Sequence, residues 1–432
     1  MKQPAIARRF TLIVGLFFAF VATADAQTIR TFRGRTMGTT YMVKIFGADE
    51  VSDDIRMEID AELRRVNDQM STYLKSSELS RFNAFESTEW FDVSPETAQV
   101  VQFAQTISKL TNGAFDVTVG SSVNAWGFGK DKRTGDPVGQ DKLEELRKSI
   151  DYKKLNVRTN PPALQKLIPQ LQVDLSAIAK GHGVDRVLDL LDAAGAKDVF
   201  VEIGGEVRTS GSKAGDPWKV GIQRPDAEMN EVLIAHAMGG DDDQGEAMAT
   251  SGDYRNFFEN DGKRYSHTID PATGAPINNN LASVSVVSKT CMAADAWATA
   301  LNVLGPGAAM RMAKKEQLDA FLITRTEDGY KMMGTGILAQ YAESVQPVHS
   351  SVAPLAQDTG GLLPTALAAA VVMGLILTGM AVGVIFGRKS ISGSCGGIAN
   401  QTNEDGSSSC ALCSNPSDAC KELREQMQKE TT

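Results

Sequence analysis

The chain has 432 residues, a formal net charge of −9 and 42% hydrophobic residues. Such an acidic chain offers no basic surface for nucleic acid, so we expect no nucleic-acid partner. Of the five cysteines, only Cys291 precedes residue 395, which excludes a disulfide scaffold for the main body. That body must instead fold around an ordinary hydrophobic core, and it is long enough to do so.

Residues 1–26 have the pattern of an export signal peptide. Lys2, Arg8 and Arg9 precede an apolar stretch, and residues 24–26, Ala-Asp-Ala, form an A-x-A cleavage site. An uncleaved membrane anchor is the alternative. In both cases we expect the segment that follows to be exported.

Residues 27–345 form the predicted main domain, in which helical and strand-like patterns alternate without repeats. We expect an amphipathic helix over 51–70, a helix that begins at Pro95 with Ser94 as its N-cap, and a helix over 184–194. Strands are expected at 39–46, 199–203, 281–288 and 320–324, and surface turns at 211–217 and 240–243. The pattern predicts an α+β fold, with mixed sheets and packed helices, rather than a doubly wound parallel sheet.

A loop-rich stretch at 113–129 combines glycines with aromatic residues, among them Phe115, Trp126 and Phe128. Such a stretch can wall a flat aromatic ligand. It is equally typical of ordinary core and turns, and the sequence leaves both interpretations open.

Residues 174–183, DLSAIAKGHG, follow a strand-like run at 171–175 and lead into the helix expected at 184–194. Free backbone N–H groups at a helix start, together with Lys180, suit an anionic ligand. The alternative is a capped helix entry with a solvated lysine.

Residues 265–274, YSHTIDPATG, place His267 beside an acid and a tight Pro/Gly turn. This setting suits proton transfer. A lone histidine is more often structural, so a structural role is the alternative.

Asp295 and Thr299 are four residues apart at the expected start of a helix, after residues 291–294. The spacing places both side chains on one face, where their oxygens can reach one hard cation such as Mg²⁺. The alternative is that Asp295 is a first-turn charge that favours the helix dipole.

The C-terminal part begins with a linker at 346–361. Residues 362–386 contain no charged residue, and this length can cross a hydrocarbon core of roughly 30 Å as a transmembrane helix. Arg388 and Lys389 follow it, so the positive-inside rule places the tail, 387–432, in the cytoplasm. The short Cys-rich tail carries Cys395, Cys410, Cys413 and Cys420, on the reducing side of the membrane.

The order of these motifs, with MGT at 37–39, MSTY at 70–73, SEL at 77–79 and TSGDYR at 250–255, resembles the ApbE family of FAD:protein FMN transferases. The resemblance runs through nearly all of 33–325. It implies a bacterial exported enzyme that splits the pyrophosphate of FAD, esterifies FMN to a threonine of a target protein and releases AMP.

The resemblance also implies roles for individual residues. The residues that would line the FAD site are Met37, Tyr73, Ala114, Phe115, Asp116, Asp174, Lys180 and Ile269. The Ala177 carbonyl, Asp295 and Thr299 would hold Mg²⁺, and His267 would transfer a proton. His182 stands where many members have an aromatic residue, and we assign it no role. Two other functions stay open: a periplasmic FAD pyrophosphatase, and a non-catalytic assembly factor that binds FAD or metal.

The tail from about 360 to 425 is similar to NqrM, the maturation factor of the Na⁺-translocating NADH:quinone reductase. Its four cysteines, including the Cys410-x-x-Cys413 pair, suit metal ligation, and the implied task is iron delivery. That reductase carries FMN on threonines, so its subunits are the expected target proteins of both halves. We therefore expect a protein of the bacterial inner membrane, with a periplasmic transferase domain and a cytoplasmic tail.

Overall fold

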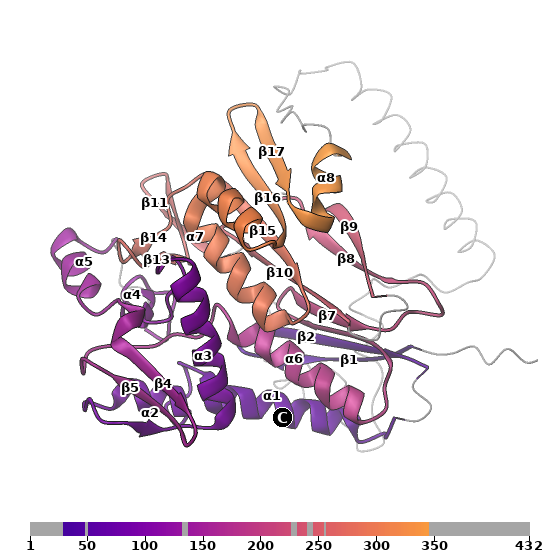
Figure 1. The fold of residues 1–432 in the computed structure, drawn as a ribbon, viewed down its shortest axis with the longest axis horizontal. Coiled ribbons are helices and arrows are strands. Elements are labelled where there is room, and N and C mark those ends of the chain that lie inside the picture. Colours follow the sequence, from indigo (N-terminus) through magenta and orange to yellow (C-terminus); the bar gives the residue numbers. More distant parts are fainter. Residues whose placement is uncertain are drawn as a thin grey trace, which may run out of the picture. The chain divides into compact units, whose positions relative to one another are not determined.

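The structure is a computed structural model that describes residues 29–47, 51–131, 137–225, 231–239, 245–254 and 256–344 (Figure 1). All of them belong to one unit, which extends to Ser350. The predicted signal peptide, linker, transmembrane segment, Cys-rich tail and the turn at 240–243 lie outside these ranges. Within them, no helix is both long enough and apolar enough to cross a membrane.

The central element is a sheet of eight strands in the order β1-β2-β6-β7-β10-β15-β16-β17. Its strands are β1 (Ile29–Thr36), β2 (Thr39–Phe46), β6 (Asp198–Ile203), β7 (Glu206–Ser210), β10 (Glu246–Gly252), β15 (Leu281–Ser288), β16 (Asp319–Thr326) and β17 (Gly329–Gly334). Every neighbouring pair is antiparallel. The α+β prediction is confirmed, but the expected mixed sheets are antiparallel, because neighbours such as β1–β2 and β6–β7 are joined by two-residue turns.

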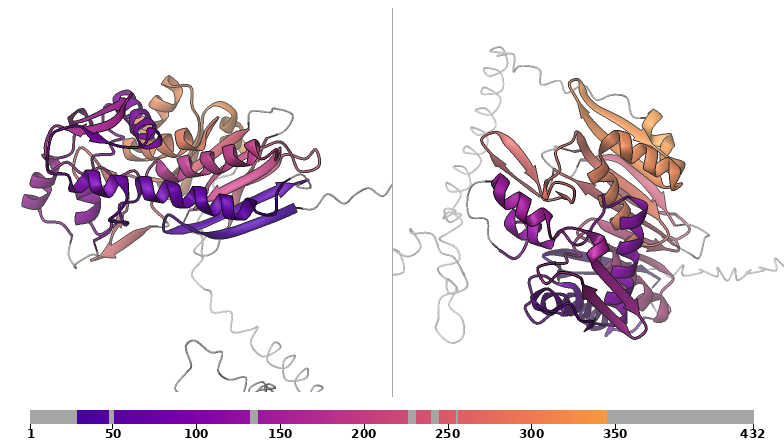
Figure 2. Two further views of the ribbon diagram at one scale, coloured as in Figure 1. Left: turned by 90° about the horizontal axis from the view of Figure 1, so that it is seen from below. Right: turned by 60° about the vertical axis from the view of Figure 1, so that its left-hand side comes forward.

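Three helices cover one face of this sheet: α1 (Ile55–Met70), α6 (Ala179–Ala193) and α7 (Cys291–Lys315) (Figure 2). Alternate residues of β2 and β6, such as Val43, Ile45 and Val201, are buried against α1 and α6. Val284 and Val286 of β15 belong to the core that α7 covers. Glycine 305 interrupts α7 with a left-handed backbone, and Pro306 follows it.

The opposite face of the sheet is covered by the hairpin of β8 (Trp218–Gln223) and β9 (Val232–Met238) and by α8 (Ala339–Ser344). Phe200 of β6 and Phe321 of β16 point to this side, one residue out of phase with the strand positions that face the helices. The sheet is therefore buried on both faces.

A second layer packs beside the helices. It contains a three-stranded sheet, β3-β5-β4, with two flanking helices. Its elements are α2 (Glu78–Ala84), β3 (Phe91–Asp92), α3 (Pro95–Leu110), η2 (Tyr152–Lys154), β4 (Leu155–Thr159) and β5 (Pro162–Lys166). Shorter elements complete the unit: α4 (Gly120–Ala125), α5 (Gln140–Arg147), β11 (Phe257–Asn260), β12 (Lys263–Ser266), β13 (Ile269–Asp270), β14 (Ala275–Pro276) and η3 (Gly336–Leu338).

Several predicted elements agree with the structure. Strands β2 and β15 have the predicted bounds, and β6 and β16 contain the predicted ranges. Helix α3 begins at Pro95, and the Ser94 hydroxyl accepts a hydrogen bond from the Thr97 N–H, as an N-cap does.

Three predicted helix starts and one predicted strand are wrong. The helix over 51–70 begins at Ile55, and the run 171–175 is no strand but a loop with one bridge at Gln172. Helix α6 begins at Ala179 instead of residue 184, so its glycines lie inside the helix. Helix α7 begins at Cys291, so Asp295 lies in its second turn and is not a first-turn charge.

The glycine at 181 lies inside α6 because the starts of α6 and α7 touch there. A Cβ atom on Gly181 would lie 2.3 Å from the Cys291 carbonyl oxygen. Asp185, one turn later, accepts hydrogen bonds from the N–H groups of Cys291 and Met292, at 2.8 and 2.9 Å. The two helix starts are thus joined by backbone contact and by a buried carboxylate.

We predict that Gly181→Ala lowers the free energy of unfolding by about 1–3 kcal/mol, because the helices must separate to admit the methyl group. Thermal denaturation of the full-length chain measures this. Gly307→Ala is the matched control, since the nearest atom to its added Cβ is the end of Arg311, 3.6 Å away. Equal melting temperatures of the Gly181 variant and the wild type would contradict the prediction.

Candidate functional site

Two of the motifs singled out in the sequence meet at the starts of α6 and α7. Lys180 and Gly181 lie in the first turn of α6, and Asp295 lies in the second turn of α7. Beside them, β7 contributes Glu206. The candidate site is therefore built from a loop-to-helix junction, a second helix and a strand end.

A lysine and two carboxylates form the buried centre of this site. The Lys180 ammonium donates a hydrogen bond to Oε1 of Glu206. Asp295 Oδ2 accepts a hydrogen bond from the Gly181 N–H at 3.0 Å. Glu206 and Asp295 are only 3% and 5% exposed, so their charges are largely removed from water.

Burial controls the ionisation of these groups. Burial raises the pKa of Asp295 to about 7, the charge of Lys180 opposes this rise, and the charge of Glu206 adds to it. Burial acts to lower the pKa of Lys180, but the carboxylates of Asp295 and Glu206 outweigh it, so the Lys180 pKa is raised. The centre is therefore rich in negative charge, which an additional cation would stabilise.

The oxygen donors at this centre are of the kind that Mg²⁺ prefers. Thr299 lies one helical turn after Asp295 on α7 and is partly buried, and Ala177 lies in the loop just before α6. Oε2 of Glu206 is buried and has no hydrogen-bond partner among the residues that the structure describes. The described residues contain no cluster of three His, Cys, Asp or Glu side chains placed to hold a metal. Mg²⁺ accepts such a sparse oxygen set, because it keeps waters and substrate phosphates as ligands.

His267 lies between β12 and β13, and its ring is oriented by the backbone. Its Nδ1 is 3.0 Å from the Asn256 carbonyl oxygen. A carbonyl can only accept, so Nδ1 carries the proton and the neutral ring has its lone pair on Nε2. Burial lowers the pKa of His267, and the positive charge of Lys180 lowers it further. The ring is therefore a neutral base at pH 7.

Four aromatic rings are stacked next to His267. Phe258 of β11 and Tyr265 of β12 have ring centroids 4.9 Å apart, and Trp126 stacks on Tyr265 at 5.6 Å. Phe128 stacks on Phe258 at 5.6 Å and meets the His267 ring edge-on. The Trp126 indole N–H donates to the Gly274 carbonyl at 3.0 Å, which joins the loop at 124–129 to the turn after β13.

The rings of Trp126, Phe128, Phe258 and Tyr265 form an aromatic wall, and Tyr73 is joined to it. The Tyr73 hydroxyl donates to the Phe128 carbonyl at 3.1 Å, while 64% of the residue stays exposed. Burial of the hydroxyl and the charge of Asp174 raise the Tyr73 pKa. Asp174 is 7% exposed, and its N–H donates to the Val117 carbonyl at 2.8 Å. These two residues therefore share one environment.

Both carboxylate oxygens of Asp116 accept hydrogen bonds from neighbouring residues. Its Oδ1 accepts from the N–H and the hydroxyl of Thr118, at 2.8 and 2.7 Å, and its Oδ2 accepts from the Tyr152 N–H at 2.8 Å. Burial raises its pKa to about 6. In this structure Asp116 shapes the loop at 113–120 that contains Ala114 and Phe115, and Phe115 is part of the core.

The remaining predicted residues lie at the edges of the site. Met37 sits in the β1–β2 turn with a φ of 48°, and its Cε would be 2.7 Å from a Cβ on Gly183 of α6. Ile269 is buried beside Trp126. Of the motif at 250–255, Asp253 forms a two-pronged ion pair with Arg325, at 2.8 and 2.9 Å.

The sequence motifs did not indicate two residues of the site, Glu206 and Asp185. Glu206 follows a Gly-Gly turn, and that glycine pair is the one signal that could have indicated it. Asp185 lies in the helix expected at 184–194, and its carboxylate accepts a hydrogen bond from Arg208 at 2.9 Å as well as those from the start of α7. His182 is buried in α6, and burial lowers its pKa to about 4, so its ring is neutral.

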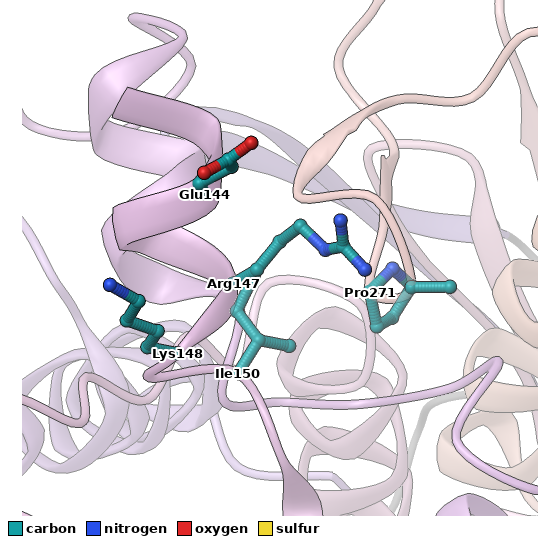
Figure 3. A pocket seen from close by; sticks show the side chains of 6 residues that line it. Glu144, Arg147, Lys148, Ile150 and Pro271 are labelled. Carbon is teal, nitrogen blue, oxygen red and sulfur yellow. The ribbon is translucent and has the colours of Figure 1, made fainter. Parts of the chain in front are cut away.

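A hollow of about 420 Å³ lies elsewhere, between the end of α5 and the turn after β13 (Figure 3). It is lined by Glu144, Arg147, Lys148, Ile150, Pro271 and Ala272. The carboxylates of the site and His267 do not line it. The buried charges and the oriented imidazole, not this hollow, therefore mark the candidate reaction site.

Comparison with known proteins gives two family matches. Residues 37–322 match the ApbE family, and residues 384–432 match NqrM, described as a (Na⁺)-NQR maturation family. The second match begins near the end of the predicted transmembrane segment.

Relatives and solved structures cover the main domain almost completely. The FAD:protein FMN transferase of Vibrio cholerae is 46% identical over 301 residues, which are 69% of this chain and 88% of that protein. That of Haemophilus influenzae is 39% identical over 344 residues, 77% of this chain and 97% of that protein.

The solved flavin transferase ApbE of Vibrio cholerae superposes with a TM-score of 0.66 at 42% identity and covers 72% of this chain and 98% of that one. A histidine-to-glycine mutant of the same protein has also been solved; it has a TM-score of 0.66 at 43% identity and covers 73% of this chain and 99% of that one. The apo flavinyl transferase ApbE of Pseudomonas stutzeri has a TM-score of 0.64 at 33% identity, covering 72% of this chain and 95% of that one. With two thirds of its sequence and its α+β fold matched in this way, the chain belongs to the ApbE family.

Proposed function

We propose that this chain is a FAD:protein FMN transferase, as its relatives of 46% and 39% identity are named. The observation that carries the proposal is the oriented His267 ring, which is near enough to Lys180 for that charge to lower its pKa, together with the buried Lys180–Glu206–Asp295 centre. A neutral base, a fixed cation and a carboxylate-rich centre are the groups that phosphoryl transfer to a hydroxyl requires. The neutral base is the one of these groups that merely storing a flavin does not need.

The proposed FAD site extends from the aromatic wall to the charged centre. In this proposal Tyr73, Asp174, Met37, Ile269 and residues 114–116 would line it. Lys180 would neutralise the pyrophosphate. The Ala177 carbonyl, Asp295 and Thr299 would hold Mg²⁺, which when bound supplies further charge neutralisation at the phosphates.

The reaction can then be written with all atoms accounted for. A threonine hydroxyl of the target protein attacks the phosphorus of the FMN half of FAD. His267 accepts the hydroxyl proton at Nε2 while the new O–P bond forms. The bond between that phosphorus and the bridging oxygen breaks, and AMP leaves with this oxygen. Lys180 offsets the charge that develops on the phosphate oxygens.

A FAD pyrophosphatase is the second candidate, because the same site would act on water in place of threonine. A non-catalytic assembly factor is the third. The experiment that separates them incubates the full-length chain with FAD, Mg²⁺ and a threonine-bearing subunit of the Na⁺-translocating NADH:quinone reductase. In-gel flavin fluorescence on the subunit, with one AMP per FMN attached, is expected. AMP with free FMN would identify a hydrolase, and no AMP would identify a binding protein.

We further propose that the NqrM-like segment gives the chain a second task in maturation of the same reductase. The match over 384–432 supports this, together with the four cysteines of the tail. In this proposal the transferase domain is periplasmic, residues 362–386 anchor it in the inner membrane, and Cys395, Cys410, Cys413 and Cys420 handle iron in the cytoplasm.

We predict that Asp295→Ala abolishes FMN transfer, because a carboxylate ligand is lost from the proposed Mg²⁺ site. Thr299→Val should impair transfer less, since a hydroxyl is the weaker ligand. The AMP release rate is measured across a Mg²⁺ titration, and a weakened metal site should shift the half-saturating Mg²⁺ concentration upward in the Thr299 variant. Full activity of the Asp295 variant at limiting Mg²⁺ would remove Asp295 from the metal site.

We predict that His267→Gly slows transfer by about 10²–10⁴-fold with little change in FAD affinity, because a general base is lost. Since the His267 pKa lies below its usual value, wild-type activity should fall as the ring is protonated, below about pH 6.5. This acid limb should disappear in the variant, and added imidazole should restore part of the rate. His349→Gly, in the predicted linker, is the control. Weakened FAD binding with normal saturated turnover would make His267 a binding residue.

We predict that a reporter active only in the periplasm is active when fused after Ser344 and silent when fused after Lys389. The physical reason is the Arg388-Lys389 pair on one side of an uncharged segment. Alkaline phosphatase activity in intact cells measures the orientation. The reverse pattern would place the tail cysteines outside and contradict the proposed iron handling.

A further inference from the structure

Glu206 occupies a rigid position at the edge of the charged centre. It follows a two-residue turn, Gly204-Gly205, whose φ angles of 65° and 111° are accessible to glycine. A Cβ on Gly204 would lie 2.9 Å from Thr39, so β2 also restricts the turn. The Gly205 N–H donates to Glu202 at 2.7 Å. The backbone of Glu206 therefore has little freedom to move.

The carboxylate of Glu206 is only half satisfied. Oε1 accepts the hydrogen bond from Lys180, whereas Oε2 is buried without a partner among the described residues. An unsatisfied buried polar group destabilises the folded state, and a buried ion pair is often replaceable as a whole by apolar side chains without loss of stability. Folding alone therefore does not explain a glutamate at this position.

Lys180 needs an external restraint. Its ammonium is carried on a flexible four-carbon chain, and its side chain is 29% exposed, so solvent is within reach. The Glu206 side chain, 4% exposed, holds the ammonium on the side where its charge acts on both Asp295 and His267. Without that bond, several rotamers of Lys180 would be open.

We propose that Glu206 is a positioning residue, which fixes the Lys180 ammonium in the place where it meets the pyrophosphate of FAD. Glu206 acts through Lys180 and does not touch the substrate. The inference rests on the proposed transferase function and adds to it a residue of β7 that holds the cation. Loss of this residue should change the rate more than the affinity, because a free lysine still attracts FAD, while misalignment of a reacting group by about 1 Å can cost 10²-fold in rate.

The test uses the full-length chain with FAD, Mg²⁺ and the reductase subunit. Glu206→Leu removes the hydrogen bond at similar volume, and Glu206→Gln keeps one acceptor oxygen. Glu231→Gln, an exposed carboxylate that pairs with Arg224 away from the site, is the control. The measurements are the AMP release rate at saturating FAD, the FAD dissociation constant by flavin fluorescence, and the melting temperature.

We expect Glu206→Leu to lower kcat by about 10- to 100-fold, with a FAD dissociation constant within about threefold of the wild type. Its melting temperature should also fall, because the Lys180 charge loses its partner, whereas the melting temperature of Glu206→Gln should stay near that of the wild type. Glu206→Gln should recover part of the rate. The double variant Lys180→Gln/Glu206→Leu should be no slower than Lys180→Gln alone, because Glu206 acts through the lysine.

Three results would overturn the inference. One is a normal kcat in Glu206→Leu. Another is additive losses in the double variant. The third is a loss of melting temperature in Glu206→Leu together with normal kinetics of Glu206→Gln, which would make the residue structural. These results are distinguishable from a failure of the proposed function. In that case the wild-type chain itself would attach no FMN to the subunit.

Discussion

The close approach of the starts of α6 and α7 is the contact on which the site depends. Gly181 has no side chain, so its backbone meets the Cys291 carbonyl, and the Gly181 N–H reaches the Asp295 carboxylate one turn along the other helix. Asp185 completes the junction by accepting the first N–H groups of α7. Helix starts carry free N–H groups and partial positive charge. Here they stabilise buried carboxylates that would otherwise be expensive to remove from water.

At the same junction the buried carboxylates outnumber the cations that face them. Asp185, Glu206 and Asp295 are buried within it, and the cations that face them are Lys180 and Arg208. Arg208 is paired with Asp185, which leaves Lys180 between the other two carboxylates. The raised pKa of Asp295 is the direct result. A divalent cation and an anionic pyrophosphate would together balance this arrangement, so the electrostatics favour binding of a metal and a phosphate group over a purely structural role.

Local sequence signals were sufficient for much of the fold. Alternation and β-branched residues located β2 and β15, and the Ser94-Pro95 pair located the start of α3, because these patterns depend on near neighbours. The start of α6 could not be found in this way. Glycines 181 and 183 disfavour a helix interior locally, and only the contact with α7 makes a glycine necessary there.

Sequence motifs identify some of the residues of the candidate site, but not how they pair. The motifs at 174–183, 265–274 and 295–299 contain His267, Lys180 and Asp295, and the structure brings them together. Glu206 lies outside these motifs, and its partner Lys180 is 26 residues away. The two meet only because β7 lies beside β6 under α6. A pairing of this kind is set by sheet order, which sequence periodicity does not encode.

The union of the two family matches in one chain has a physical consequence. In the proposed function a transferase and an NqrM-like segment serve one membrane reductase, and on separate chains each would have to find it by diffusion. On one chain, engagement of either part raises the effective concentration of the other, provided that the connecting segment spans the distance. In the proposed topology this segment is a short linker and a single membrane-spanning helix, which restrict the transferase domain to the membrane surface. Flavin attachment and iron delivery would then be coupled by geometry alone, without any contact between the two parts.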